Sequence, residues 1–195
     1  MRAAQGAQFT GNPEMSARIV ILTGERGVGK STVCYKTVGL AQASEYACGG
    51  VLTLSRSNGG RDVLDVRSGD VRRLTLEPGA SEGMFHEGVI QGRFRFDPAT
   101  LAWGNDVLSR AAPCDLLVVD ELGPLEMERG RGWVRAFDVL GNADFTLALV
   151  VVRPELLVRI QLKLPTSATT VFTVTRRNRD GLPGVILKVL ESAAS

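Results

Sequence analysis

Hydrophobic positions along the chain follow two alternating patterns. Short apolar runs suited to buried strands are separated by segments in which apolar residues recur at helical spacing. Strands that alternate with helices favour a parallel sheet covered on both faces, so the pattern predicts an α/β fold with a mostly parallel sheet. The expected strands cover residues 18–22, 50–54, 115–120, 145–152 and 169–174.

The segment after the second strand departs from this alternation. An Asn-Gly pair within the turn at 57–60 is a strong hairpin signal, and it is followed by a strand-like run at 61–67. A second turn at 68–70 precedes another short run at 71–76. We therefore expect an antiparallel β-meander inserted after the second strand, outside the parallel core.

Two further segments precede the next helix. Residues 77–92 are rich in glycine and are predicted to form a mobile flap. Residues 93–96 alternate charged with aromatic side chains, as at the edge of a sheet. Asp97 followed by Pro98 combines an N-cap residue with proline at the first helical position, which predicts a helix reaching about residue 112.

Apolar residues at helical spacing indicate which side chains are buried. Trp103 and Trp133 lie in such segments and are assigned to the core. A similar stripe, also assigned to the core, consists of Leu156, Ile160 and Leu164.

The most specific motif is IVILTGERGVGKST at residues 19–32. It places Gly24, Gly29, Lys30 and Ser31 in the spacing G-x-x-x-x-G-K-[ST], after an apolar strand and before a helical segment. Glycines let the backbone wrap an anion, and main-chain N–H groups at a helix N-terminus bind phosphate. The motif predicts a phosphate-binding loop and therefore nucleotide binding.

Roles within this loop follow from the chemistry of a nucleoside triphosphate. Lys30 is expected to pair with the β- and γ-phosphates, and the Ser31 hydroxyl to join the coordination shell of Mg²⁺. The residues expected to contact the nucleotide are Gly24, Glu25, Arg26, Gly27, Val28, Gly29, Lys30, Ser31 and Thr32.

A second motif, DLLVVDELGPLE at 115–126, has the form of a Walker B strand. Its apolar run carries Asp120 to the C-terminal edge of the sheet, where ligands of open α/β proteins bind, so this carboxylate is predicted to hold Mg²⁺. Glu121 would orient and deprotonate an attacking water as the general base. The adjacent Asp-Glu pair favours the hydrolytic, additional-strand branch of P-loop proteins.

Composition narrows the remaining possibilities. The chain has 195 residues, 44% of them hydrophobic, which suits one well-buried domain, predicted over 18–195. The formal net charge is +2 and the arginines are scattered between acids, so no basic stripe predicts nucleic-acid binding. Residues 1–17 are polar and Gly-containing and are expected to be a disordered leader, within which Met15 could be the initiator.

Cysteine and histidine content excludes several kinds of site. The 3 cysteines lie far apart without a C-x-x-C pair, which argues against a disulfide framework or a zinc site and favours a reducing compartment. His86 is the only histidine and is interpreted as a loop residue, so no histidine-built metal site is expected. The longest apolar run is too short to span a membrane. The protein is predicted to be soluble and cytoplasmic.

Together these motifs resemble a known family. TGERGVGKST, VVDELGPLE and Asn178-Arg179-Asp180 are similar to the small nucleoside-triphosphatase family, which contains the cancer-related nucleoside-triphosphatase. The resemblance spans about 18–192 and implies a compact RecA-like P-loop fold. It also implies broad hydrolysis of nucleoside triphosphates to diphosphate and phosphate. Gly123 and Glu126 match the end of the family's second motif.

The chain departs from the family pattern at two strand ends. Where the family usually has an acidic pair before an arginine, this sequence has Leu54 and Ser55 before Arg56. After the strand at 145–152, where the family tends to have a small polar residue, it has Arg153. Arg153 is near the expected position of the γ-phosphate and is a candidate arginine finger in cis. The alternative is a solvated arginine beside a helix that begins at Pro154.

The loop after the last strand is predicted to border the base. It precedes a closing helix begun by Pro183. Two assignments are open: Arg179 lies over the nucleobase, or Asp180 caps the next helix. Stacking of Arg179 without readout of the base edge would explain tolerance of different bases, because every base has a π-face.

Two other functions remain open at this point. A small-molecule or nucleotide kinase would need an acceptor pocket and usually an arginine-bearing lid, whereas residues 161–167 contain only Lys163. A nucleotide-driven switch or assembly ATPase would use the meander and the Gly-rich segment to contact a protein partner. Hydrolysis of a Mg²⁺ nucleoside triphosphate is the favoured prediction.

Overall fold

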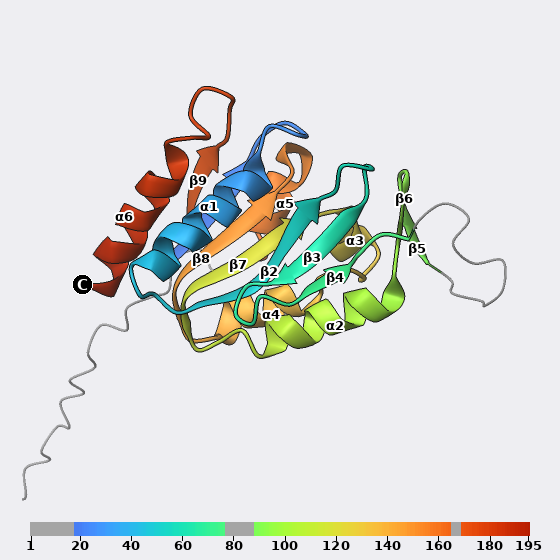
Figure 1. Ribbon diagram of the computed structural model, residues 1–195, viewed down its shortest axis with the longest axis horizontal. Helices are drawn as coiled ribbons and strands as arrows, with labels where there is room; N and C mark the ends of the chain where they lie inside the picture. Colours follow the sequence, from blue (N-terminus) through green and yellow to red (C-terminus); the bar gives the residue numbers. More distant parts are fainter. Residues whose placement is uncertain (1–17, 77–87, 165–168) are drawn as a thin grey trace, which may run out of the picture.

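A seven-stranded sheet runs through the centre of the molecule (Figure 1). The computed structural model describes residues 18–76, 88–164 and 169–195. The expected leader at 1–17, Met15 and His86 therefore lie outside the described residues. The strands of this sheet are β1 (Arg18–Thr23), β2 (Cys48–Ser55), β3 (Arg61–Asp65), β4 (Val71–Arg73), β7 (Cys114–Leu122), β8 (Phe145–Val152) and β9 (Thr169–Thr173).

The order of the strands is β4-β3-β2-β7-β8-β1-β9. The pairs from β2 through β9 are all parallel, which confirms the predicted mostly parallel sheet. β8 lies between β1, which leads into the phosphate loop, and β7, which carries the second motif. This intervening strand is the arrangement expected of the additional-strand branch of P-loop proteins.

The antiparallel meander is present at the edge of the same sheet. β2 pairs with β3, and β3 with β4, in antiparallel register. The run predicted at 71–76 is shorter in the structure, where β4 ends at Arg73. The flap expected at 77–92 stays a prediction. Its last part contains β5 (Val89–Gln91), which forms an antiparallel hairpin with β6 (Phe94–Phe96), and Val89 pairs with Phe96. Residues 77–87 lie outside the described part of the chain.

Helices cover both faces of the sheet (Figure 1). On one face are α1 (Lys30–Ala43) and α6 (Leu182–Ala194), and on the other are α2 (Pro98–Ser109), α4 (Arg135–Asn142) and α5 (Leu157–Gln161). The short helices α3 (Pro124–Glu128) and η1 (Pro154–Leu156) follow β7 and β8. No helix in the described ranges is long and apolar enough to cross a membrane.

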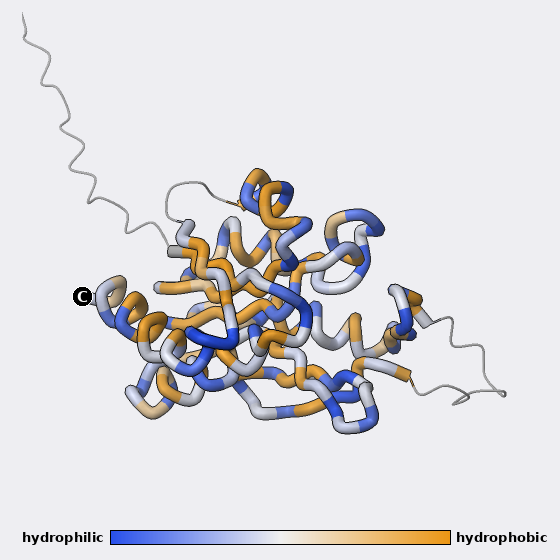
Figure 2. Tube along the Cα trace, turned by 90° about the horizontal axis from the view of Figure 1, so that it is seen from above, coloured by the Kyte–Doolittle hydropathy of each residue, from blue (hydrophilic) through white to orange (hydrophobic). Residues whose placement is uncertain are grey.

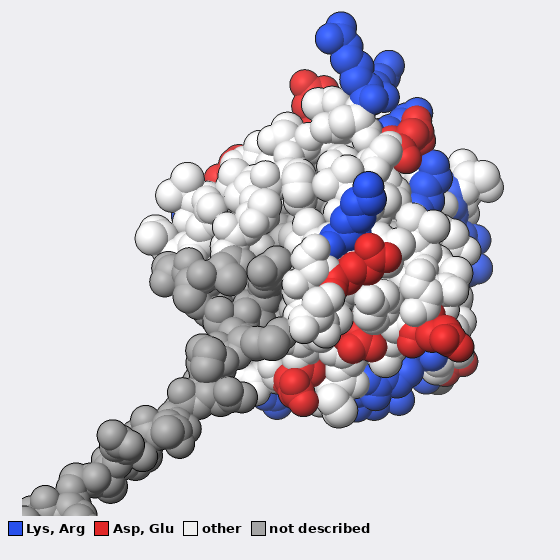
Figure 3. Space-filling model, turned by 90° about the vertical axis from the view of Figure 1, so that its left-hand side faces the viewer, with Lys and Arg blue, Asp and Glu red and all other residues white. Residues whose placement is uncertain are grey.

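Burial on both faces explains the continuous apolar runs of the central strands. In β8, Leu147 and Leu149 pack toward α1 and α6, whereas the intervening Ala148 and Val150 pack toward α2, α4 and α5. Figure 2 shows that hydrophobic segments concentrate in these strands. On the face seen in Figure 3, acidic and basic side chains are mixed, in keeping with the net charge of +2.

Several local predictions can be compared with the structure directly. Asp97 is the N-cap of α2 and accepts from the N–H groups of Ala99 and Thr100, each at 3.2 Å, although the helix ends at Ser109 and not near residue 112. Trp133 is 3% exposed, as expected of a core residue. Trp103 is only partly buried and carries the Arg72 guanidinium 4.5 Å from its ring centroid. The cysteines are buried and free, without a disulfide: Cys34, Cys48 and Cys114.

Gly104 allows α2 to pack closely against Trp133. A Cβ atom at Gly104 would lie 2.3 Å from the Trp133 ring, whereas one at Gly39, an exposed position within α1, would meet nothing within 4 Å. We expect Gly104→Ala to lower the free energy of unfolding by roughly 1–3 kcal/mol through overpacking. Gly39→Ala should raise it by up to about 1 kcal/mol, because alanine favours the helix. Chemical denaturation of both variants measures the difference, and equal effects of the two would contradict it.

Candidate active site

The phosphate loop connects β1 to α1, and α1 begins at Lys30. Gly24, Gly27 and Gly29 have φ angles of 142°, 75° and 110°. Residues with a Cβ atom rarely adopt positive φ angles of this size. Gly24 also lies against the chain after β9, where a Cβ would be 2.5 Å from the Val174 carbonyl oxygen. The glycines of the motif are thus required by backbone conformation and by close packing.

Lys30 lies folded over this loop. Its Nζ donates to the carbonyl oxygens of Gly24 at 2.7 Å and Glu25 at 3.0 Å, and the residue is 8% exposed. Burial lowers the pKa of Lys30, while the charges of Glu121 and Asp120 act in the opposite direction. The ammonium group therefore lies near both carboxylates of the second motif.

Asp120 is at the C-terminal part of β7 and is 1% exposed. Its carboxylate accepts from the Thr53 N–H at 3.2 Å, and its carbonyl oxygen accepts from the Thr53 hydroxyl at 2.6 Å. Burial raises the pKa of Asp120 to about 7, and the nearby Ser31 side chain acts against that rise. The structure thus joins the two sequence motifs through Ser31 and Asp120.

The oxygen atoms of this pair suit Mg²⁺. The cation prefers hard oxygen ligands and usually keeps several waters, with one or two carboxylates and substrate phosphates completing its shell. Among the described residues no group of three or more His, Cys, Asp or Glu side chains could hold a metal alone. A hydroxyl beside a single buried carboxylate is the donor set that a phosphate-bound Mg²⁺ requires.

Glu121 forms an ion pair that sequence analysis did not predict. Both Nε and Nη2 of Arg153 donate to Glu121 Oε1, at 2.8 and 2.7 Å. The two side chains are 36% and 34% exposed, so the pair borders the cavity without being sealed from solvent. Arg153 is thus both paired with Glu121 and partly exposed, beside η1, which begins at Pro154. Parallel neighbours β7 and β8 end side by side, which brings the two residues together.

The loop between β9 and α6 contradicts one of the two assignments that the sequence left open. The N-cap of α6 is Gly181, so the prediction that Asp180 caps this helix is wrong. Asp180 instead accepts from Lys36 Nζ at 3.1 Å, which ties the loop to α1. Arg179 lies against the phosphate loop, where its Nη1 donates to the Val28 carbonyl oxygen at 3.5 Å.

The family's missing acidic pair is replaced by small polar side chains. Thr53 contacts Asp120 as described, and the Ser55 hydroxyl accepts from the Arg61 guanidinium. At the positions of that pair the sequence has Leu54 and Ser55, at the end of β2, and Asp62 of β3 lies opposite Leu54.

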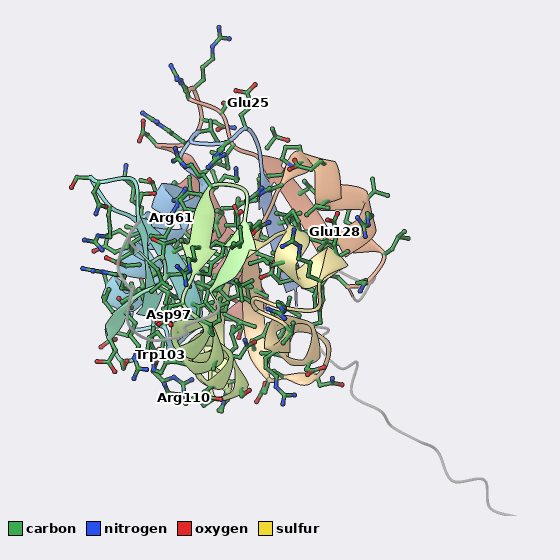
Figure 4. All side chains as sticks on the ribbon, turned by 90° about the vertical axis from the view of Figure 1, so that its right-hand side faces the viewer. Glu25, Arg61, Asp97, Trp103, Arg110 and Glu128 are labelled. Atoms are coloured by element: carbon green, nitrogen blue, oxygen red, sulfur yellow. The ribbon has the colours of Figure 1, made fainter. Side chains whose placement is uncertain are left out.

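A cavity of about 480 Å³ unites these residues. From the predicted site it is lined by Gly24, Arg26, Gly27, Gly29, Lys30, Ser31, Thr32, Asp120, Glu121 and Arg153. Glu25 and Val28 belong to the loop without lining the cavity, and Arg179 contacts the loop from outside it. Figure 4 shows the β5–β6 hairpin in front of this region, with Arg61 on one side, Glu128 on the other and Glu25 above.

Sequence analysis missed one structural element of the site. Glu126, 8% exposed, accepts from the N–H groups of Gly123 at 2.7 Å and Trp133 at 2.8 Å, which fixes the turn after β7 and the loop before α4. Burial raises the pKa of Glu126 to about 7. The spacing of Gly123, Pro124 and Glu126 is that of a helix start with a capping glutamate, a signal that could have predicted this contact.

Comparison with known proteins agrees with the site. The model of a family described as NTPase matches residues 19–187. The nucleoside-triphosphatase THEP1 of Methanopyrus kandleri is 33% identical over 180 residues, covering 88% of this chain and 95% of the relative. That of Methanosarcina barkeri is 30% identical over 177 residues, covering 86% and 94%.

The fold has a counterpart among solved structures. The crystal structure of THEP1 from the hyperthermophile Aquifex aeolicus matches with a TM-score of 0.62 and 22% identity, covering 89% of this chain and 99% of that one. At this identity the likeness supports the P-loop fold. The family resemblance predicted from the motifs is confirmed, and the chain belongs to the NTPase family of P-loop proteins.

Proposed function

We propose that this protein hydrolyses the γ-phosphate of nucleoside triphosphates with Mg²⁺ and tolerates different bases. The observation that carries the proposal is the convergence of Lys30, Ser31, Asp120 and Glu121 on one cavity. The relatives are named nucleoside-triphosphatases, which favours hydrolysis over the kinase and switch alternatives. The proposed site is in the part of the chain that the family model covers.

Binding of the polyphosphate is assigned to the loop and to the N-terminus of α1. The free N–H groups at that terminus and the Lys30 ammonium supply positive charge to the anion. Lys30 now donates to two neutral carbonyl oxygens. A phosphate oxygen is the stronger acceptor, because charge-assisted hydrogen bonds are roughly twice as strong as neutral ones.

Ser31 and Asp120 are the proposed ligands of Mg²⁺. The bound cation would neutralise charge that develops on the β- and γ-phosphate oxygens. Thr53 holds Asp120 by hydrogen bonds to both its carboxylate and its carbonyl group, so the ligand is oriented before the nucleotide binds.

We assign Glu121 and Arg153 to the step in which water attacks the γ-phosphate. Glu121 Oε1 holds the guanidinium of Arg153, and Oε2 remains available to accept a proton from water. Arg153 keeps the Glu121 side chain at the cavity edge and supplies positive charge near the expected γ-phosphate. Both roles require that the two residues remain adjacent at the ends of β7 and β8.

Arg179 is the proposed neighbour of the base. Its side chain lies on the β9 side of the phosphate loop, away from Glu121 and Arg153, and is 44% exposed. Contact with a ring face, without hydrogen bonds to the base edge, is compatible with any of the common bases.

Phosphate release from a panel of ATP, GTP, CTP and UTP tests the proposal. We expect similar rates for all four with Mg²⁺ and none with excess chelator. Lys30→Ala should abolish measurable turnover, because the phosphate loop loses its ammonium group. Lys30 is the only buried lysine in the described part of the chain. Lys36→Ala, which removes an exposed lysine of the same helix, is the matched control and should retain turnover. Release confined to one base would contradict the proposed tolerance.

Glu121→Gln tests the general base. The amide keeps the shape of the side chain but cannot take up a proton, so turnover should fall by roughly 10²–10⁴ while the nucleotide remains bound. Single-turnover phosphate release and equilibrium binding measure the two properties separately. Glu128→Gln removes an exposed carboxylate of α3 as a control. Wild-type release by the Glu121 variant would remove the assignment.

Arg153→Ala tests whether Arg153 stabilises the charge that develops in the transition state. If Arg153 acts as a finger in cis, turnover should fall by about 10³ or more with little change in nucleotide affinity. Arg159→Ala breaks a comparable pair with Glu128 outside the cavity and should leave turnover unchanged. A loss below about tenfold would mean that Arg153 only positions Glu121.

A further inference from the structure

The cavity extends well beyond the phosphate loop. Its far end is enclosed by side chains from the β4–α2 segment, α2, α3 and the loop before α4. These apolar lining residues are Leu74, Phe94, Phe96, Leu101, Leu125 and Trp133. Apolar and aromatic walls with a few polar groups are typical of small-molecule sites. The volume of about 480 Å³ belongs to the whole cavity, which this end shares with the phosphate loop.

We call the part of the cavity enclosed by these apolar residues the compartment. Its position separates it from the proposed path of the nucleotide. Arg179 follows β9 at one edge of the sheet, whereas Arg61 of β3 belongs to the opposite edge, and β7 with Asp120 lies between them. A triphosphate that runs from Arg179 past Lys30 to Asp120 ends with its γ-phosphate facing the compartment. The apolar walls thus lie beyond the terminal phosphate and away from the base.

One polar group in the compartment has no partner. The Nε2 atom of Gln91 is buried and makes no hydrogen bond to any residue that the structure describes. Gln91 is on β5 and pairs with Phe94 across the hairpin. An unsatisfied buried donor is unfavourable, so an acceptor atom on a bound molecule would be favoured here.

Two arginines that line the cavity lie beside Phe94. The guanidinium carbons of Arg61 and Arg26 lie 5.5 and 5.7 Å from the centroid of the Phe94 ring, on β3 and on the phosphate loop respectively. Within the described ranges neither arginine forms a salt bridge. Arginine binds phosphate and carboxylate groups well, because its planar fork matches two oxygens at once.

We propose that this compartment binds a second ligand, a flat aromatic ring bearing an anionic group, at the same time as the nucleoside triphosphate. The ring lies between the aromatic and leucine side chains and accepts from Gln91, and the anionic group pairs with Arg61 and Arg26. A nucleoside monophosphate has this chemistry and is the probe of choice. The inference rests on the proposed function, because it places the γ-phosphate at the inner end of the compartment.

Equilibrium dialysis with radiolabelled AMP tests simultaneous binding. The full-length protein is first saturated with Mg²⁺ and the β,γ-imido analogue of ATP, so that the first site is filled. We expect one further equivalent of AMP to bind, with uncharged adenosine at least about tenfold weaker because it lacks the group that pairs with arginine. The amount of bound analogue is measured in the same samples.

Two variants connect that binding to the compartment. Gln91→Leu should weaken AMP binding by about three- to tenfold through loss of one hydrogen bond, with the analogue bound as in the wild type. Arg61→Met should abolish the preference for AMP over adenosine. The controls are Gln161→Leu on α5 and Arg73→Met on β4, which do not line the cavity.

Three outcomes would overturn the inference. AMP could show no saturable binding, it could displace the analogue so that the two share one equivalent, or it could bind equally well to the Gln91 and Arg61 variants. Failure of the analogue itself to bind is a separate result: it contradicts the proposed function and removes the basis of simultaneous occupancy with it.

Discussion

The proximity of the Ser31 side chain to the Asp120 carboxylate is the feature on which the site depends. Ser31 is on the first turn of α1 and Asp120 is in β7, and their strands β1 and β7 are separated by β8. Parallel strands in register end at the same edge of a sheet, so the loop after β1 and the carboxylate of β7 face one another across the end of β8. The two motifs therefore meet at this edge although they lie on strands that are not direct neighbours.

Burial makes it unfavourable for the side chains of this site to carry their charges. Asp120 is almost inaccessible, and its pKa is raised to about 7 by that burial despite its hydrogen bonds. A cation favours the charged form of this buried carboxylate, because its attraction for the negative charge opposes the desolvation penalty. The same reasoning applies to Lys30, whose pKa burial lowers and whose ammonium group lies near two carboxylates. Nucleotide and metal thus complete a set of charges that the fold brings together.

The sequence predicted the elements whose physical requirements are local. The glycines of the phosphate loop, the N-cap at Asp97 and the apolar strands each follow from conformational or burial constraints that act over a few residues. The pairing of Arg153 with Glu121 depends instead on which strands are neighbours, which spacing alone does not determine. Asp180 was misassigned for the same reason, since its partner Lys36 is on a helix far away in the chain. The β5–β6 hairpin was obscured by the glycines on both sides of it.

Water and a second ligand would compete for the same space next to the terminal phosphate. Hydrolysis requires one oriented water, and the polar side chains that line the cavity near Asp120 include Glu121, Thr53 and Ser55. Arg26 belongs to the phosphate loop and also contacts Phe94 of the hairpin, so the loop and the outer compartment share a residue. A shift of Arg26 toward phosphate would loosen its contact with Phe94. Such a shift would couple occupancy of the loop to the shape of the compartment.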